Sequence, residues 1–369
     1  MMRTSSDIEA AIKAVPHHLR QTMRSLAAQA DIPKTTILRH MKATSRLKAR
    51  SSYIRPMLTD ANKRARIKFA ASFLRPTSGG TTFVNMHDYV HVDEKWFYLT
   101  KVKRRYYVYD DEEVAARACK HKSHITKIMF LAAVARPRYD PHTRSFFDGK
   151  IGVWPFVQES VAKRSSKNRP RGTVIIEPQS VNGDVYCDKM LNEVVPAIHA
   201  KFPVATLAKG VKIQQDNASP HRCVTTELLH ANEVIGITIE NQPPNSPDFN
   251  VLDLGFFNSI QSLQHQKSTR SIEELIGAVE SAFYSLPSDT LAKTFITLQK
   301  VMEKSLEMLG SNNYKLPHLR KDASIDDLLS YNVECNATCV TSALVHLDLR
   351  LGEEARMEEE CNSTEQVPL

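Results

Sequence analysis

Hydrophobic positions between residues 82 and 266 follow first a strand pattern and then an alternation of strands and helices. Continuous or alternating apolar runs predict strands over residues 89–99, 105–109, 125–135, 174–177, 211–215 and 237–241. Stripes at helical spacing predict helices over residues 184–202, 225–231 and 254–266. This order is typical of an α/β fold in which helices pack on a mixed sheet.

Residues 18–42 show a different pattern, two short helical stripes around a tight turn. Apolar residues at helical spacing form one stripe within residues 23–30 and a second within 37–41, on either side of Asp31. Pro33 suits the first turn of the second helix because its missing N–H costs nothing there. The pattern predicts a helix-turn-helix, whose second helix enters the major groove of DNA. Short helix pairs are, however, also common in proteins that do not bind DNA.

Basic residues are concentrated at the N-terminal end. Residues 1–76 contain 16 Lys and Arg against 4 Asp and Glu, a net charge of +12, so the rest of a chain with a total of +8 carries −4. A basic module on a weakly acidic body is typical of a polyanion-binding protein whose affinity falls as salt rises. The candidate DNA contacts are Lys34, Thr35, Thr36, Arg39, His40, Lys42, Arg46, Lys48 and Arg50.

Residues 51–80 read as a basic connector. The cluster KRARIK occupies residues 63–68, in a helix predicted to begin at Thr59. Three roles stay open for it: contact with DNA phosphates, a nuclear import signal, or a solvated helix face. The small and polar run 77–80 is the best candidate for a domain boundary.

Composition narrows the protein class further. With 369 residues, of which 42% are hydrophobic, the chain can form a large domain and a smaller module. It has no apolar run of membrane-spanning length and no apolar stretch of the kind a secretory signal needs, so we expect a soluble intracellular protein without a membrane partner. Its six cysteines include no Cys-x-x-Cys pair, which argues for reduced thiols rather than a zinc ribbon or disulfides.

Three aspartates stand at positions that the predicted elements bring together. Asp93 lies within the first strand, Asp216 ends the strand 211–215, and Asp253 precedes the helix 254–266. Three converging carboxylates repel one another unless divalent cations occupy the site. Oxygen ligands with open water positions suit Mg²⁺ or Mn²⁺. We therefore predict a site for two such ions, of the kind that cleaves and joins phosphodiesters.

Each aspartate taken alone is more simply explained as a helix or turn cap, and nearby residues compete for the role. Asp248 is interpreted as the cap of a turn. Glu94 follows Asp93, and neighbouring strand residues point to opposite faces, so only one of them can join the cluster. His221 is a candidate phosphate or carboxylate partner, although a lone histidine is more often structural.

Three sequence blocks resemble the signature blocks of mariner-type transposases of the Tc1/mariner superfamily, most of all the plant-type branch. Residues 91–98 read HVDEKWFY, residues 214–221 read QQDNASPH, and residues 242–257 read QPPNSPDFNVLDLGFF. The segment 167–173, KNRPRGT, resembles a further block of that branch. The likeness covers about residues 20 to 300.

The resemblance implies a ribonuclease H-like catalytic fold and cut-and-paste DNA transposition. It implies binding to terminal inverted repeats in double-stranded DNA, insertion at TA, a homodimer that pairs two ends, and a nuclear location. It assigns the three metal-ligand positions to Asp93, Asp216 and Asp253. The basic segment 167–172 is interpreted as a surface loop, with a minor-groove hook as the alternative.

The chain also departs from the family pattern. Asp216 and Asp253 are separated by fewer residues than in plant-type members and by more than in animal mariners, which leaves the branch open. Family members usually carry two helix-turn-helix units, but only one fits before residue 50. We therefore expect a truncated DNA-binding domain. The alternative to an active transposase is a catalytically silent, transposon-derived DNA-binding protein.

The expected domain organisation follows the pattern, the charge and the resemblance together. It comprises a helix-turn-helix domain over residues 1–50, a basic linker over 51–80, a catalytic domain over 81–270, accessory helices over 271–345 and a disordered acidic tail over 346–369.

Overall fold

The computed structural model describes residues 4–49, 55–78, 80–99, 125–165, 169–267, 269–316 and 327–349. The strand predicted over residues 105–109 lies outside these ranges. The chain divides into two units, Met1–Arg55 and Pro56–Leu369, each of which is described by itself.

The smaller unit is a helical module built around a few apolar side chains. Its elements are α1 (Ser5–Ala14), the 3₁₀ turn η1 (His17–Leu19), α2 (Met23–Gln29) and α3 (Lys34–Thr44). Ile8, Ile12, Leu26 and Ile37 meet in its core, so the predicted helix pair packs against a third helix, α1. Asp31, in the turn, has a φ of 50°, the left-handed conformation that glycine adopts more readily.

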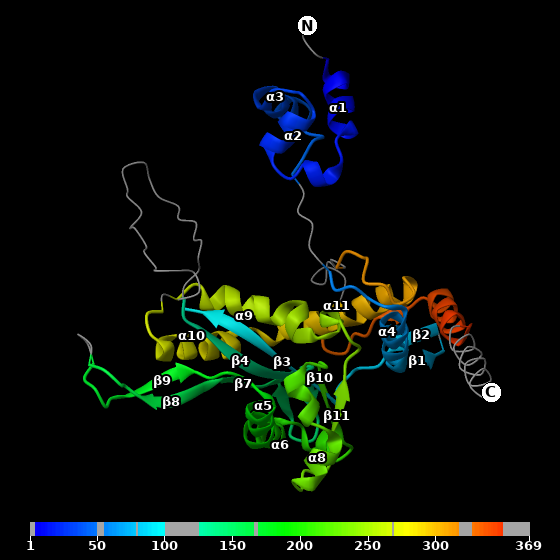
Figure 1. Ribbon diagram of the computed structural model, residues 1–369. Helices are drawn as coiled ribbons and strands as arrows, with labels where there is room; N and C mark the ends of the chain where they lie inside the picture. The colour runs from blue at the N-terminus through cyan, green and yellow to red at the C-terminus, as the bar shows by residue number, and fades with distance from the viewer. Residues whose placement is uncertain are drawn as a thin grey trace, which may run out of the picture. The chain divides into compact units, whose positions relative to one another are not determined.

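A five-stranded mixed sheet forms the centre of the larger unit, in the order β11-β10-β3-β4-β7 (Figure 1). Its strands are β3 (Tyr89–Tyr98), β4 (Lys127–Ala135), β7 (Lys150–Pro155), β10 (Val211–Gln215) and β11 (Ile237–Asn241). The first three form an antiparallel meander, whereas β10 runs parallel to both β3 and β11. The sequence predicted all of these strands except β7.

Helices cover both faces of the sheet (Figure 1). One face packs against α5 (Gly183–Lys189), the π-helical turn η3 (Met190–Val194) and α6 (Val195–Lys201). Beyond it in the chain lie α7 (Val204–Leu207) and α8 (Thr226–Ala231). The other face packs against α4 (Asp60–Ser72), the π-helical turn η6 (Leu252–Phe256), α9 (Phe257–Gln264), α10 (Ile272–Ser285) and α11 (Ser288–Glu307). The predicted helices over 184–202, 225–231 and 254–266 are thus present, the first and last with π-helical segments.

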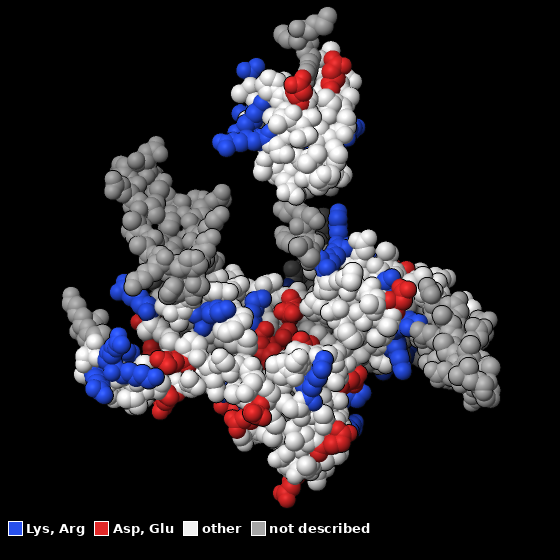
Figure 2. Space-filling model, viewed as in Figure 1, with Lys and Arg blue, Asp and Glu red and all other residues white. Residues whose placement is uncertain are grey.

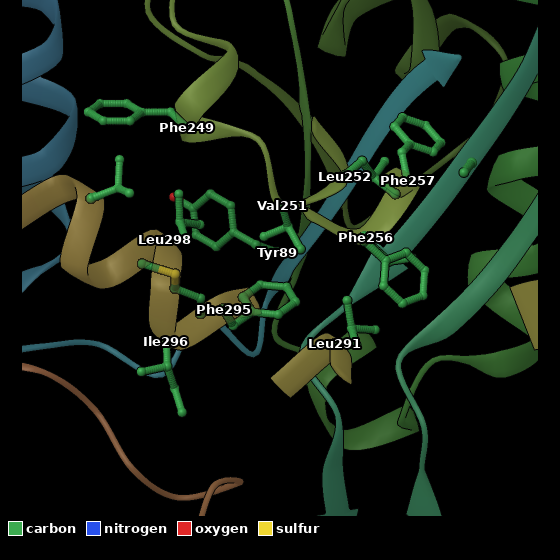
Figure 3. Packing of buried hydrophobic residues seen from close by; sticks show 14 of the residues in the cluster. Tyr89, Phe249, Val251, Leu252, Phe256, Phe257, Leu291, Phe295, Ile296 and Leu298 are labelled. Atoms are coloured by element: carbon green, nitrogen blue, oxygen red, sulfur yellow. The ribbon is translucent and has the colours of Figure 1, made fainter. Parts of the chain in front are cut away.

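The alternation of side chains along β3 separates two hydrophobic cores. Val90 and Val92 join the core beneath α5 and α6, whereas Tyr89 and Phe97 join the core beneath α9 to α11. Figure 3 shows the latter core, in which Phe256, Phe257 and Phe295 pack beside the strands. This packing fixes η6, the element that carries Asp253, against β3.

Smaller strand pairs flank the central sheet. β1 (Leu74–Thr77), β2 (Gly80–Phe83) and β12 (Glu334–Cys335) form one small sheet, and two hairpins are made by β5 (Arg138–Asp140) with β6 (Ser145–Phe147) and by β8 (Val157–Val161) with β9 (Val174–Pro178). The strand predicted over residues 174–177 therefore exists, but it pairs with β8 outside the central sheet.

Three expected boundaries differ from the structure. Thr77 and Gly80, at the two ends of the expected boundary, pair with each other as members of β1 and β2. Since α4 also packs in the main core, these elements belong to the larger unit rather than to a linker. The helices α10 and α11 are part of the same core, not an accessory layer. A helix spans residues 337–349, so the expected tail is helical over 346–349, and the rest of it lies outside the described residues.

Among the helices of the described part, none has the length and apolar character needed to cross a membrane.

Candidate active site

The three predicted carboxylates come from three elements that meet at one edge of the sheet. β3 and β10 are parallel neighbours, and His91 is paired with Gln214. Asp93 and Asp216 each lie two residues beyond that pair, so the register places them at the same level. Asp253 lies in η6, on the face of the sheet where α9 to α11 pack.

All three side chains line one cleft of about 510 Å³, together with Arg222 and residues 242–247. Figure 2 shows acidic side chains gathered near the middle of the larger unit, over β3. The structure thus brings together the residues that the sequence singled out. None of the three lies on the far side of the sheet from the others.

Burial disfavours the charged form of both Asp93 and Asp253. Burial raises the pKa of Asp93 well above its usual range, and the nearby carboxylates of Asp253 and Glu94 raise it further. Burial also raises the pKa of Asp253, opposed by the charge of Lys95 and by a hydrogen bond with Asp93, although this side chain remains open to solvent on its cleft side. The pKa values of both carboxyl groups are therefore raised, chiefly by burial.

Asp216 is held by a histidine. Burial alone would raise the pKa of Asp216, but His221 and the backbone N–H of Ala218, 2.9 Å from Oδ1, lower it overall. His221 forms an ion pair with Asp216 through Nδ1 and lies 3.0 Å from Glu94 Oε1 through Nε2. Burial would lower the pKa of His221, yet these two carboxylates raise it to about 10, so the imidazolium bridges them.

Glu94 therefore reaches the site indirectly. It points to the opposite face of β3 from Asp93, as alternation predicts, where Tyr186 stacks on the His221 ring at 4.1 Å. His221 is the carboxylate partner that the sequence suggested. Its pairing with Glu94 could not be read from the sequence, because 126 residues separate the two positions.

Asp248 has a different role from the predicted turn cap. Its carboxylate accepts two hydrogen bonds from the guanidinium of Arg66 on α4, at 2.7 and 2.8 Å. Arg66 is fully buried, and the short helix η5 (Pro247–Phe249) that carries Asp248 has no side-chain cap. The prediction was wrong because the partner of Asp248 lies 182 residues away in the sequence.

The donor set fits a hard divalent cation, but its present arrangement is not a ready-made ligand shell. Carboxylate oxygens on a solvent-open cleft are the ligands that Mg²⁺ and Mn²⁺ prefer. Within the described ranges, no group of three or more His, Cys, Asp or Glu side chains is arranged to hold a metal ion. Asp216 turns toward His221 instead, so convergence of the three carboxylates requires Asp216 to reorient.

The predicted DNA contacts divide into exposed and engaged residues. Exposed positions on and after α3 include Lys34, Thr35, Arg39, Lys42 and Lys48, and Thr36 is partly exposed. His40 was wrongly expected on the outer face, because its side chain is buried and its Nδ1 lies 3.3 Å from Ser5 Oγ of α1. Arg46 pairs with Glu9 at 3.1 Å and so ties α3 to α1. Arg50 lies outside the described residues.

The basic segment 167–172 joins the strands of the β8–β9 hairpin. Residues 167 and 168 lie outside the described part, whereas Arg169 and Arg171 line a hollow with Lys163 and Arg164. The exposure of residues 170–172 agrees with the expected surface loop.

The fold matches solved structures of a transposase assembled with DNA. The Mos1 mariner paired end complex with Mn matches with a TM-score of 0.54 at 16% identity, over 85% of this chain and 80% of that chain. The Mos1 strand transfer complex gives the same values. The mariner Mos1 paired end complex with Mg gives a TM-score of 0.55 at 16% identity, over 84% and 79%. No protein-family model and no curated protein sequence matches the chain.

At this identity the likeness establishes the fold. The larger unit is a ribonuclease H-like mixed sheet with flanking helices, preceded by a small all-α helix-turn-helix unit, as the sequence predicted.

Proposed function

We propose that the chain is a mariner-like DNA transposase that cleaves and joins DNA with two Mg²⁺ or Mn²⁺ ions held by Asp93, Asp216 and Asp253. The observation that carries this proposal is the meeting of these carboxylates, from β3, the end of β10 and η6, in one cleft of a ribonuclease H-like fold. The structural neighbours with this fold are transposase complexes solved with Mn and with Mg. The resemblance of the three sequence blocks and of the segment 167–173 supports the plant-type branch within this proposal.

Two bound ions would activate the attacking water or 3′-hydroxyl and stabilise the leaving oxygen. The protein's own part is to hold the carboxylates in place and to receive the DNA backbone. In this structure His221 is buried between Asp216 and Glu94 and holds the Asp216 carboxylate by an ion pair, which Asp216 would leave to join the ligands. Arg222, on the cleft wall, carries a positive charge suited to a phosphate beside the acids.

We further propose that the helix-turn-helix unit reads terminal inverted repeats, with Lys34, Thr35, Arg39 and Lys42 of α3 in the major groove. Support comes from their exposure and from the basic balance of this end of the chain. A homodimer that pairs two ends, insertion at TA and a nuclear location belong to the same proposal. The neighbours described as paired-end and strand transfer complexes favour the first of these.

The test is cleavage of a plasmid that carries the genomic DNA flanking the coding sequence. We expect nicking that requires Mg²⁺ or Mn²⁺ and is abolished by Asp216→Ala. Asp184→Ala is the matched control, since Asp184 lies in the first turn of α5 and does not line the cleft. Cleavage that is indifferent to Asp216→Ala would rule out the proposed active site.

A second candidate is a DNA-binding protein without nuclease activity. The ion pair of Asp216 with His221, which turns this carboxylate away from a metal-ligand shell, favours it. That protein would bind the flanking DNA with a steep salt dependence but leave it intact at every metal concentration. The plasmid assay therefore separates the two.

A further inference from the structure

A buried amide side chain joins the two backbone segments that carry Asp93 and Asp253. Asn250 lies between η5 and η6 and is fully buried. Its Nδ2 donates to the carbonyl oxygen of Val92 at 3.1 Å. Its Oδ1 accepts from the backbone N–H of Leu252 at 2.9 Å. Val92 immediately precedes Asp93, and Leu252 immediately precedes Asp253.

We propose that Asn250 is a positioning residue that sets the separation of Asp93 and Asp253 and so tunes divalent-metal binding. The proposal rests on the function proposed above and adds a residue outside the three carboxylates. Asn250 does not line the cleft, so it acts through the backbones on either side of it.

The chemistry of the link requires an amide. One side chain must donate to the Val92 carbonyl and accept from the Leu252 N–H at the same time, which the two ends of the asparagine amide do. An ionised aspartate has no donor, a serine hydroxyl is too short to reach both groups, and alanine has neither donor nor acceptor. Both partner groups are buried main-chain groups, which rarely remain unpaired. Loss of the side chain would therefore leave the Val92 carbonyl without this donor, and the segment that leads into η6 would lose this hydrogen bond to β3.

The local turn has its own backbone bonds. The Asn250 N–H donates to the Pro247 carbonyl at 3.1 Å, and the Asn250 carbonyl accepts from the Leu254 N–H at 2.9 Å. The turn that leads into η6 is thus held without the side chain. The side chain adds the hydrogen bond to the carbonyl of Val92, which lies 158 residues away in the sequence.

A shift of about 1 Å in a catalytic group can lower a reaction rate about 100-fold. We therefore expect Asn250→Ala to lower the single-turnover cleavage rate on this order and to raise the Mg²⁺ concentration for half-maximal cleavage. The affinity for DNA should not change. Asn250→Ser keeps a hydroxyl that can accept from Leu252 N–H but does not reach Val92. If the alanine variant folds poorly, this variant tests the hydrogen bond to Val92 by itself.

Gln299→Ala is the matched control. Gln299 is also a fully buried amide that joins two backbones, since its Nε2 donates to the Val84 carbonyl at 3.0 Å and its Oε1 accepts from Val333 N–H at 2.8 Å. Neither of those segments carries a proposed ligand. This variant should lose thermal stability, as the Asn250 variants do, but keep the wild-type metal response.

Binding of Mn²⁺ measured by electron paramagnetic resonance, without DNA, separates this inference from the proposed function. We expect Asn250→Ser to weaken Mn²⁺ binding about tenfold, with Gln299→Ala at the wild-type value. Equal Mn²⁺ affinities for the wild type and Asn250→Ser, or equal losses in Asn250→Ser and Gln299→Ala, would overturn the positioning role. If the protein cuts no DNA but its Mn²⁺ binding still depends on Asn250, the positioning role is upheld and only the proposed nuclease activity is refuted.

Discussion

The ion pair between Arg66 and Asp248 gives a quantitative prediction for stability. Arg66 on α4 is fully buried, and the side chain of Asp248 is 19% exposed. Besides its two bonds to Asp248, the guanidinium donates to the Gly310 carbonyl and to the Tyr314 hydroxyl, both at 2.9 Å. It also lies 4.2 Å above the Phe249 ring. Among the residues that the structure describes, Asp248 supplies the carboxylate that compensates the charge of Arg66.

Asp248→Asn keeps the shape of the side chain and removes that compensating charge. Breaking a buried ion pair on one side costs roughly 3–5 kcal/mol, and the partial exposure of Asp248 favours the lower end. For a large domain, about 3 kcal/mol corresponds to a fall in melting temperature of roughly 6–12 °C. The control is Glu193→Gln, whose side chain is 42% exposed and pairs with Lys189, four residues earlier in the sequence. Helix pairs of this spacing contribute about 0.5 kcal/mol or less.

Differential scanning calorimetry and chemical unfolding measure both effects. Arg66→Met combined with Asp248→Leu should recover much of the stability lost in Asp248→Asn, because a buried pair can be replaced by apolar side chains at little cost. Equal melting temperatures for Asp248→Asn and Glu193→Gln would refute the reasoning. So would a double variant as unstable as the sum of its single changes.

Three further predictions concern other parts of the chain. His87→Gln should reduce the loss of stability on acidification, because burial first and then Arg138 and Arg136 lower the pKa of this histidine from 6.5 to about 3. As pH falls, the unfolded chain binds a proton at this histidine before the folded chain does, so its contribution to stability is fully present above pH 6.5 and is lost toward pH 3. Melting temperatures measured across this range check the prediction. The same pH dependence in His87→Gln and the wild type would contradict it. Arg39→Gln should lower DNA affinity and reduce the slope of log affinity against log salt by about 1, as measured by fluorescence anisotropy; an unchanged slope would remove Arg39 from the interface. Gly310→Ala should cost about 1–3 kcal/mol, since Gly310 has a φ of 82° and an added Cβ would meet the Lys63 carbonyl oxygen at 2.2 Å; unaltered unfolding in denaturant would contradict this.

The sequence predicted the elements whose pattern is local. The apolar run of β4 and the helical stripes of α2 and α3 carry their periodicity within a few residues, and the structure contains them. The strand β7, KIGVWP, was missed because it contains a glycine and ends in a proline, which weaken a strand pattern.

The site was predicted only in part, because its remaining features depend on contacts between distant segments. The meeting of the three aspartates was expected from their places in two predicted strands and before a predicted helix, and from the resemblance of the three sequence blocks. The bonds of Asp248 to Arg66 and of Asn250 to Val92 join segments 182 and 158 residues apart. His40 was expected on the DNA-facing side of α3, but the position of α1, which buries it, is not encoded in the pattern of α3 alone.

The most direct test of the central claim is an anomalous difference map from crystals of the wild-type chain grown with Mn²⁺. The account predicts manganese peaks in the cleft in contact with carboxylate oxygens of Asp93, Asp216 and Asp253, with Asp216 turned away from His221. A cleft without manganese at saturating concentration, or manganese held there without these carboxylates, would contradict it.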